Sequence, residues 1–406
     1  MTTALDQKEW QPAADTADSS KKEEGGKRPR GKARFVFELS LYLAVAMVGL
    51  EGLLGAIGVG QQEIMMPEAE LGCVHIPGKM VTWRLEGYSR GKFSSAGLRD
   101  REREIAKPAG VYRIAVMGDS AAEGLQVEQN ETYAARLEER LNRKQNQSKQ
   151  NQGAKFEVIN FGCSSYSTGQ EYLQYKRQVQ AYKPDLILLM MCKGDTLENN
   201  LNPQDRNKAE PRPYFYLDQA GQLEQDNSIL QMNKAKLSQD GWFNQTVNWL
   251  RANSNVYGMV SRTNFNLFLS DKAYFRLTRL LQDISRKASS LGGKEEIAVP
   301  LYGAQNNRQV TLALLSRFNQ EAKAAGTRFA VTLFPDVTNS DQDWKDTIKA
   351  LKDRASAEDF DVIDLQPPFR QDKNPQGLFL QYHFSRAGHE LTADTIEKFL
   401  EQKKIR

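Results

Sequence analysis

Residues 113–120, RIAVMGDS, decide the fold of this chain. The apolar run 113–117 is typical of a buried strand, and Gly118, Asp119 and Ser120 follow it directly. The next segment, 121–137, leads into a helix. A serine between a strand and a helix lies at the carboxyl edge of a parallel sheet, where open α/β sheets bind their ligands. Ser120 is therefore the candidate nucleophile, since this position offers both exposure and the field of a helix N-terminus.

The remaining chain alternates short apolar runs with helical segments. Four further runs, rich in Val, Ile and Leu, are predicted strands: 156–161, 185–191, 328–334 and 361–365. Helices are predicted at 131–143, 170–182, 310–325, 343–354 and 387–402. This alternation predicts an α/β fold, with a parallel sheet between two helical layers, as in flavodoxin-like three-layer α/β/α domains.

The N-terminal region predicts a membrane anchor. Residues 1–34 are polar and basic, as in a disordered tail, and residues 39–60 are almost wholly apolar. About 20 such residues cross a bilayer as a helix, so we assign a transmembrane helix to 35–60. The basic flank predicts a cytoplasmic N-terminus and a translocated C-terminal body. The alternative, a cleaved signal peptide, fits the long polar lead and the length of the apolar stretch less well.

Glu51 is an exception within this apolar stretch. An ionisable side chain at that depth costs at least ~2.5 kcal/mol. Glu51 either contacts a partner helix or is protonated, and the sequence does not decide between them.

The rest of the chain divides into three parts. We assign 61–107 to a linker or N-terminal extension and 108–406 to one catalytic domain, with an insertion or cap at about 202–302. The aromatic residues of the insertion, Trp242, Trp249, Tyr257 and Phe265, either line a substrate cleft or pack the cap onto the core, which is the commoner role of large aromatics.

Composition excludes several classes of function. The chain has 406 residues, 40% of them apolar, and a net charge of only +4, much of it in the N-terminal tail, so we expect no nucleic-acid partner. Three scattered cysteines argue against a disulfide framework or a zinc site, and we predict no metal and no cofactor. Cys163 and Cys192 follow neighbouring strands, where they either form a bridge or remain as small buried thiols.

Three further polar blocks lie beside the predicted strands and helices. The first two each follow a strand, and the third precedes the last helix. They are 160–171 (NFGCSSYSTGQE), 194–200 (GDTLENN) and 382–389 (YHFSRAGH). A glycine such as Gly162 in a turn can bring its N–H close to an oxyanion. An imidazole base must come from His75, His383 or His389, because the chain has no other histidine.

In order and placement, these blocks resemble the SGNH (GDSL-type) hydrolase superfamily. The segments 93–102 (FSSAGLRDRE), 166–171 and 214–223 are similar to its membrane-anchored bacterial branch, and the resemblance covers about 90–400. It implies Ser120 as nucleophile, Gly162 as an oxyanion donor and His383 as general base. It assigns His389 a structural role at a helix start, while His75 lies near the anchor.

Two positions depart from the family pattern. Asp195 stands where the family has an oxyanion-binding asparagine, so it can donate only if a raised pKa keeps it protonated, unless Asn199 or Asn200 replaces it. Gln381 stands near the position of the family's aspartate. The Gln381 amide can hydrogen-bond the imidazole, but it has no charge with which to stabilise the imidazolium. Asp364 is a candidate for a carboxylate from elsewhere in the chain.

The sequence therefore predicts a membrane-anchored serine hydrolase or acyltransferase outside the cytoplasm. Relatives of this architecture imply an O-acyl ester as substrate, most plausibly an acetyl ester of a cell-envelope or exported carbohydrate. We expect a single-pass protein of the bacterial inner membrane, with envelope proteins as further partners. Two alternatives stay open: an impaired scaffold that binds glycan without turnover, and a lipid esterase.

Overall fold

The computed structural model describes residues 30–61, 63–147, 155–201, 209–238, 240–261, 307–336 and 341–405. The chain divides into two compact units, Met1–Leu50 and Glu51–Arg406. Helix α1 (Arg30–Ile57) begins earlier and ends earlier than the predicted 35–60. Its residues Gly31–Ile57 are long and apolar enough to cross a membrane, as an anchor or as a signal sequence would be. The rest of the predicted tail lies outside the described residues.

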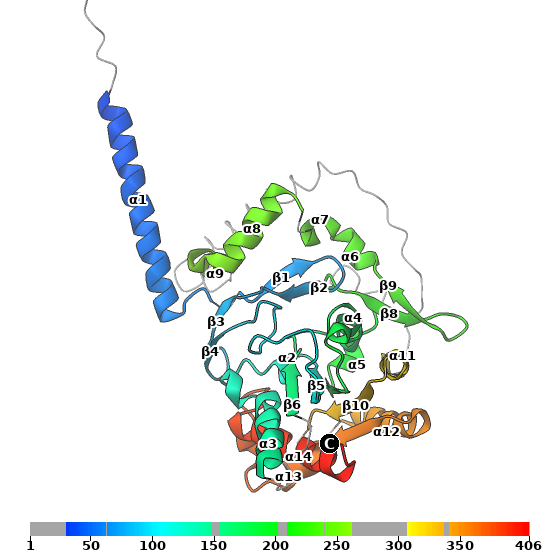
Figure 1. Cartoon of the computed structure of the whole chain (residues 1–406). Coiled ribbons are helices and arrows are strands. Elements are labelled where there is room, and N and C mark those ends of the chain that lie inside the picture. Colours follow the sequence, from blue (N-terminus) through cyan, green and yellow to red (C-terminus); the bar gives the residue numbers. More distant parts are fainter. Residues whose placement is uncertain are drawn as a thin grey trace, which may run out of the picture. The chain divides into compact units, whose positions relative to one another are not determined.

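The unit Glu51–Arg406 is built on one parallel sheet of five strands, as predicted (Figure 1). The strands are β5 (Val111–Met117), β6 (Lys155–Asn160), β7 (Leu186–Met191), β10 (Arg328–Leu333) and β11 (Asp361–Asp364). Their spatial order is β11-β10-β7-β5-β6. The chain moves outward in opposite directions from β5, so the topological switch point lies between β5 and β7.

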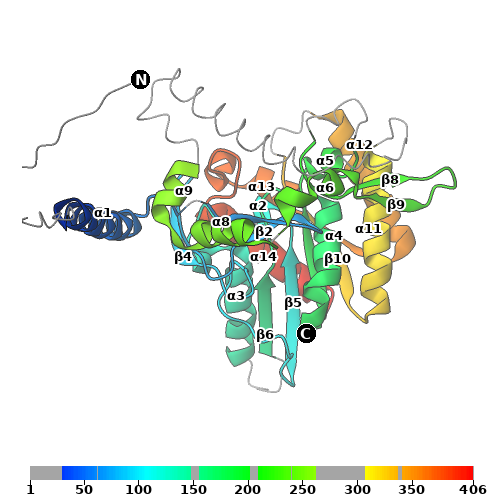
Figure 2. The same ribbon diagram turned by 90° about the horizontal axis from the view of Figure 1, so that it is seen from above.

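Helices cover both faces of this sheet (Figure 2). One face packs on α3 (Tyr133–Gln147), α13 (Gln366–Gln371) and α14 (Arg386–Gln402). The other packs on α4 (Thr168–Arg177), α11 (Asn307–Ala324) and α12 (Gln342–Glu358). Successive strand residues alternate between the two apolar cores, with Ala115 in one and Val116 in the other. The sheet is therefore buried on both sides, as its continuous apolar runs predict.

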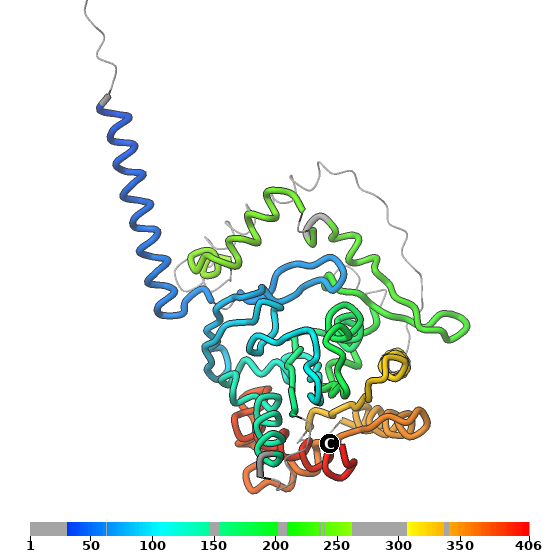
Figure 3. The backbone as a smooth tube through the Cα atoms, in the orientation of Figure 1, coloured from blue at the N-terminus to red at the C-terminus, as the bar shows by residue number. Residues whose placement is uncertain are grey.

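The predicted linker 61–107 contains ordered structure instead. It forms two antiparallel hairpins, β1 (Met65–Glu68) with β2 (Gly72–His75) and β3 (Met80–Trp83) with β4 (Ser89–Lys92). The backbone trace follows this extension from the end of α1 to the first strand of the sheet (Figure 3). Polar-apolar alternation in four-residue strands is too short a signal to find them in the sequence.

The described part of the insertion contains one hairpin and four helices. These elements are β8 (Tyr214–Leu217), β9 (Leu223–Asp226), α6 (Ser228–Met232), α7 (Lys234–Leu237), α8 (Trp242–Asn253) and α9 (Asn255–Ser261). Phe215 of the hairpin packs edge-on against Tyr172 of α4, with ring centroids 6.4 Å apart. Trp242 and Trp249 are exposed, so neither packs the insertion onto the core. Phe265 lies outside the described residues.

Glu51 binds the start of helix α9. Its carboxylate accepts hydrogen bonds from the Ser254 hydroxyl and from the backbone N–H groups of Asn255 (2.7 Å) and Val256 (3.2 Å). These are the donors that a helix N-terminus leaves unpaired. Of the two explanations that the sequence left open, the partner helix is the one found.

The three cysteines, Cys73, Cys163 and Cys192, are free thiols, so Cys163 and Cys192 form no bridge. Burial raises the pKa of both thiols well above its usual value. They are small packing residues rather than a redox pair.

Candidate active site

Ser120 lies where the sequence placed it, at the carboxyl end of β5. It is the first residue of the short helix α2 (Ser120–Glu123), and the Asp119 side chain caps this helix by accepting from the Ala121 N–H (2.9 Å). Gly118 has a φ of 143° and is packed against Ala122 and Met190, so a side chain at this position would collide with both. The Gly-Asp-Ser sequence thus fits a tight strand-to-helix turn that holds the Ser120 hydroxyl at the sheet edge.

His383 contacts Ser120 directly, although 263 residues separate them in the sequence. The distance between His383 Nε2 and Ser120 Oγ is 2.8 Å. The Leu380 N–H donates to the His383 carbonyl (2.8 Å), and this turn presents the imidazole to the serine. The structure therefore brings together the two residues that the sequence analysis placed first.

Glu86 completes the hydrogen-bonded chain and was not predicted. Its Oε2 lies 2.6 Å from His383 Nδ1, and its Oε1 accepts from the backbone N–H groups of Tyr382 (2.5 Å) and His383 (3.0 Å). Burial opposes ionisation of Glu86, but these hydrogen bonds outweigh it and lower its pKa below the usual value. Glu86 is thus a carboxylate, and its charge faces the imidazole.

The turn that carries Glu86 approaches the serine loop closely. Gly87 has a φ of 74°, and a Cβ there would collide with the Gln126 carbonyl and the Leu380 side chain. The Tyr88 N–H donates to the same Gln126 carbonyl (3.1 Å). Glycine at position 87 therefore permits the contact that brings Glu86 to His383.

Glu86 escaped prediction for a physical reason. It belongs to the extension, 297 residues from His383, in a segment without helical or strand periodicity. Only an indirect signal was present. No acidic residue directly precedes His383 in the sequence, so a carboxylate partner for the imidazole would have to come from elsewhere in the chain.

The two predicted partners of His383 lie away from it. Gln381 is exposed in the turn, where Glu86 occupies the position beside the imidazole. Asp364 is the last residue of β11, which β10 and β7 separate from β5. Its carboxylate binds Lys352 Nζ (2.6 Å) and the Gln366 N–H (3.0 Å). Neither residue supports the imidazole in this structure.

Three of the predicted oxyanion donors are already hydrogen-bonded. The Gly162 N–H donates to the Asn160 side chain (2.9 Å), and a Cβ at Gly162 would collide with the backbone of α2. The buried Asn199 amide donates to the Asp195 carbonyl (2.7 Å) and to Thr311 (2.9 Å). Asn200 donates to the Phe215 carbonyl (3.0 Å). These groups hold the loops in shape instead of pointing free donors at a substrate.

Asp195 remains as a candidate donor. It begins helix α5 (Asp195–Glu198) after β7, the strand next to β5, and one of its oxygens accepts from the Cys192 N–H (2.6 Å). Burial and repulsion from Asp119 raise its pKa well above the usual value. A neutral carboxyl group is therefore favoured, and it carries a proton to donate.

The segment 93–102, FSSAGLRDRE, braces the loops around Ser120. The buried Arg99 guanidinium donates to the carbonyls of Glu123 (3.1 Å), Gly124 and Val127 (2.5 Å), which end helix α2 and follow it. Burial lowers the pKa of Arg99 to about 10, so it stays a cation at neutral pH. Asp100 accepts from the Asn160 N–H (3.0 Å). One short segment thus fixes the turns after β5 and β6.

The two other histidines have structural contacts. His75 Nε2 lies 3.1 Å from the buried Glu123 carboxylate, which also accepts from the Ser164 N–H (2.8 Å). His389 is buried in α14, accepts from the Tyr133 N–H (3.2 Å), and has its pKa lowered to about 3 by burial. His389 is therefore neutral, and His383 is the histidine that touches Ser120.

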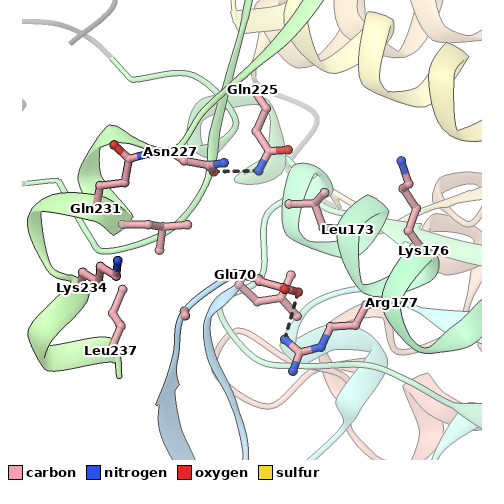
Figure 4. Close-up of a pocket in the computed structure, with 12 residues that line it drawn as sticks. Glu70, Leu173, Lys176, Arg177, Gln225, Asn227, Gln231, Lys234 and Leu237 are labelled. Atoms are coloured by element: carbon pink, nitrogen blue, oxygen red, sulfur yellow. Dashed lines mark hydrogen bonds and ion pairs between the residues drawn. The ribbon is translucent and has the colours of Figure 1, made fainter. Parts of the chain in front are cut away.

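A cavity of about 580 Å³ lies away from this centre, between α4, α6 and α7 (Figure 4). Neither Ser120 nor His383 lines it. Two pairs of its polar groups bind each other: Gln225 with Asn227 (2.7 Å) and Arg177 with Glu70 (3.7 Å). We assign no ligand to it. Within the described residues, no group of three or more His, Cys, Asp or Glu side chains is placed to hold a metal ion.

A serine, a histidine and a carboxylate joined at the carboxyl edge of a flavodoxin-like sheet define the class of SGNH-type hydrolases. The chain belongs to the GDSL-like lipase/acylhydrolase family, whose model matches residues 116–391. No curated protein matches the sequence. The family match leaves out Glu86, which lies before its first residue.

Two solved structures are similar to this chain at low identity. A putative acylhydrolase from Bacteroides fragilis has 11% identity and a TM-score of 0.37, covering 74% of this chain and 92% of its own. A catalytic mutant of Axe2, an acetylxylan esterase from Geobacillus stearothermophilus, has 12% identity and a TM-score of 0.37, covering 72% and 93%. At these identities and TM-scores, the similarity indicates nothing about the activity of this chain.

Replacing Arg99 tests whether the segment 93–102 stabilises the loops around Ser120. Arg99→Met removes hydrogen bonds from a buried cation to three carbonyls, and we expect the free energy of unfolding to fall by about 1.5–3 kcal/mol. Thermal denaturation of the detergent-solubilised chain measures this. Arg101→Met is the matched control, since Arg101 is more than half exposed. Equal melting temperatures for the two variants would contradict the role of Arg99.

Proposed function

We propose that this protein is a membrane-anchored serine esterase or acyltransferase. The observation that carries the proposal is the continuous chain of hydrogen bonds Ser120–His383–Glu86. The absence of a charge partner at position 381 favours a scaffold without turnover. Glu86 supplies that charge from another part of the chain, so the main reason for the scaffold is removed.

The geometry supports acyl transfer through a covalent intermediate. Ser120 Oγ attacks the ester carbonyl carbon while His383 Nε2 takes its proton. The Glu86 carboxylate stabilises the imidazolium through Nδ1–H. His383 then gives the proton to the departing alcohol oxygen as the carbon–oxygen bond breaks, which leaves the acyl group on Ser120. Water or a second hydroxyl group, deprotonated by His383, then attacks the acyl carbon. The bond from that carbon to Ser120 Oγ breaks, and His383 returns the proton to Ser120.

Two groups are proposed to stabilise the oxyanion. The Ser120 backbone N–H forms no hydrogen bond within the described residues and lies at the start of α2. The second donor is the protonated carboxyl group of Asp195, which replaces the amide of the family pattern. The buried position of Asp195 beside Asp119 supports the neutral form.

The substrate and location rest on the sequence. Membership of the family implies an ester substrate. The resemblance of segments 93–102, 166–171 and 214–223 to the membrane-anchored branch supports an O-acetyl ester of envelope or exported carbohydrate. The basic flank of α1 supports anchoring in the bacterial inner membrane, with the catalytic domain outside the cytoplasm.

A fluorophosphonate probe tests whether Ser120 is activated. We expect the full chain in detergent to be labelled and Ser120→Ala to abolish labelling, because the probe reacts with serines whose proton a base removes. Ser165→Gly is the control: Ser165 is exposed on a neighbouring loop with a φ of 66°, which glycine adopts readily. A wild-type chain that resists high probe concentrations would favour the scaffold. With an O-acetylated oligosaccharide, free acetate identifies hydrolysis and an acetylated second saccharide identifies transfer.

Glu86→Gln tests the charge partner. The amide cannot stabilise the imidazolium and can favour the wrong tautomer, so we expect the labelling rate to fall by about 10⁴-fold. The pKa of Glu86 is lowered, so its carboxylate is present throughout the neutral range and is lost only in acid. Gln381→Ala is the matched control and should keep the wild-type rate; the reverse result would assign the role to Gln381.

Asp195→Asn and Asp195→Leu test the neutral acid. The amide restores a donor and should stay within about tenfold of the wild-type rate, whereas leucine should lose about 10²–10³-fold. The raised pKa of Asp195 means that the donor is present at lower pH and is lost as the pH rises through that pKa. Ester hydrolysis by the wild type should therefore decline as the pH rises through that pKa, and hydrolysis by Asp195→Asn should lack this decline. Identical pH profiles of the two proteins would show that Asp195 donates no proton to the oxyanion.

A further inference from the structure

Helix α8 presents large aromatic side chains to the outside. None of its residues is buried, and the exposed fractions are 78% for Trp242, 62% for Phe243 and 62% for Trp249. Trp242 and Trp249 lie two helical turns apart and share one face. Large aromatic side chains that are exposed together on one helix face indicate a binding surface.

Two sets of polar contacts fix α8 and α9 to the end of α1 and to the extension. The Glu51 carboxylate holds the N-terminus of α9, which follows α8 directly. Buried Lys79, just before β3, donates to the carbonyls of Arg251 (2.6 Å) and Ala252 (3.1 Å) in the last turn of α8. The aromatic helix is therefore not free to move away from these segments.

Backbone packing reinforces this attachment. A Cβ at Gly258 of α9 would collide with the carbonyl of Gly60, and a Cβ at Gly60 would collide with the carbonyl of Asn255. Two glycines thus let α9 lie directly on the chain that leaves α1. The place where α1 ends is, for a membrane-spanning helix, the boundary between lipid and water.

We infer that α8 is a second membrane contact, with Trp242, Phe243 and Trp249 lying among the lipid headgroups. The inference rests on the proposed role of α1 as a membrane anchor. Trp is enriched at the membrane interface because its ring is apolar and its N–H is polar.

Lipid explains this face better than a protein partner. The contacts of α9 with Glu51 and Gly60 hold the adjoining helix α8 near the chain that leaves α1. Attachment at α1 alone would leave the catalytic domain free to rotate about the anchor, whereas a second contact through α8 restricts that rotation. The bilayer therefore accounts for both the aromatic residues and the polar contacts that hold them.

Brominated lipids test the inference in the full chain. Bromine on an acyl chain quenches only those tryptophans that contact the lipid. The protein is reconstituted into phosphatidylethanolamine and phosphatidylglycerol vesicles with bromine at shallow or deep acyl positions. We expect shallow bromine to quench the emission most strongly, and the Trp242→Phe/Trp249→Phe variant to lose this quenching. Phenylalanine keeps the apolar ring, so the contact itself persists.

Trp344→Phe is the matched control. Trp344 is buried in the core, so removing its unquenched emission should increase the quenched fraction. If quenching is unchanged in the Trp242→Phe/Trp249→Phe variant, the inference is overturned. Lipid then does not contact α8, whether another protein or another part of the chain covers the helix.

Two separate measurements distinguish a failure of this inference from a failure of the α1 anchor or of the proposed enzyme activity. Resistance of the protein to alkaline extraction from the vesicles reports the α1 anchor, and fluorophosphonate labelling reports Ser120. A chain that is extracted overturns the anchor and the inference with it, whereas an anchored, labelled chain without quenching overturns the inference alone.

Discussion

The proposed catalytic centre depends on the contact between Glu86 and His383. One carboxylate binds the imidazole and two backbone N–H groups of the same turn, so it fixes both the ring and the loop that carries it. This requirement explains the extension before the sheet: its second hairpin must reach the turn after α13, and Gly87 makes the close approach sterically allowed. A segment outside the family match thereby becomes part of the active site.

The same extension also holds the serine. Arg99 and Asp100 bind the backbone after β5 and β6, so the turn bearing Ser120 is braced from outside the sheet. The buried contact of His75 with Glu123 adds a second tie to α2. Hydrogen bonds inside a low-dielectric core favour one arrangement strongly when every partner is present. The hairpins and the sheet therefore form one catalytic unit, in which neither part is complete alone.

The fold was predictable because its signals are local and repeated. Five apolar runs and five helical segments gave the strands and helices to within a few residues, and the Gly-Asp-Ser turn located Ser120. The failures share a cause, which is contact between residues distant in sequence. Nothing local marks Glu86 as the partner of His383, or Asn199 as a buried amide that binds Thr311. Gln381 and Asp364 were chosen by proximity in sequence and by type, and neither criterion reports where a side chain points.

The position of Glu86 in the sequence, between α1 and the sheet, has a consequence for any form of the protein that has lost α1. A protease that cuts the chain before Glu86 would shed a fragment with all three members of the hydrogen-bonded chain. A cut between Glu86 and Val111, where the sheet begins, would shed the serine and the histidine without a covalent link to the carboxylate. In that form only the non-covalent contacts of the hairpin would keep the carboxylate beside the imidazole.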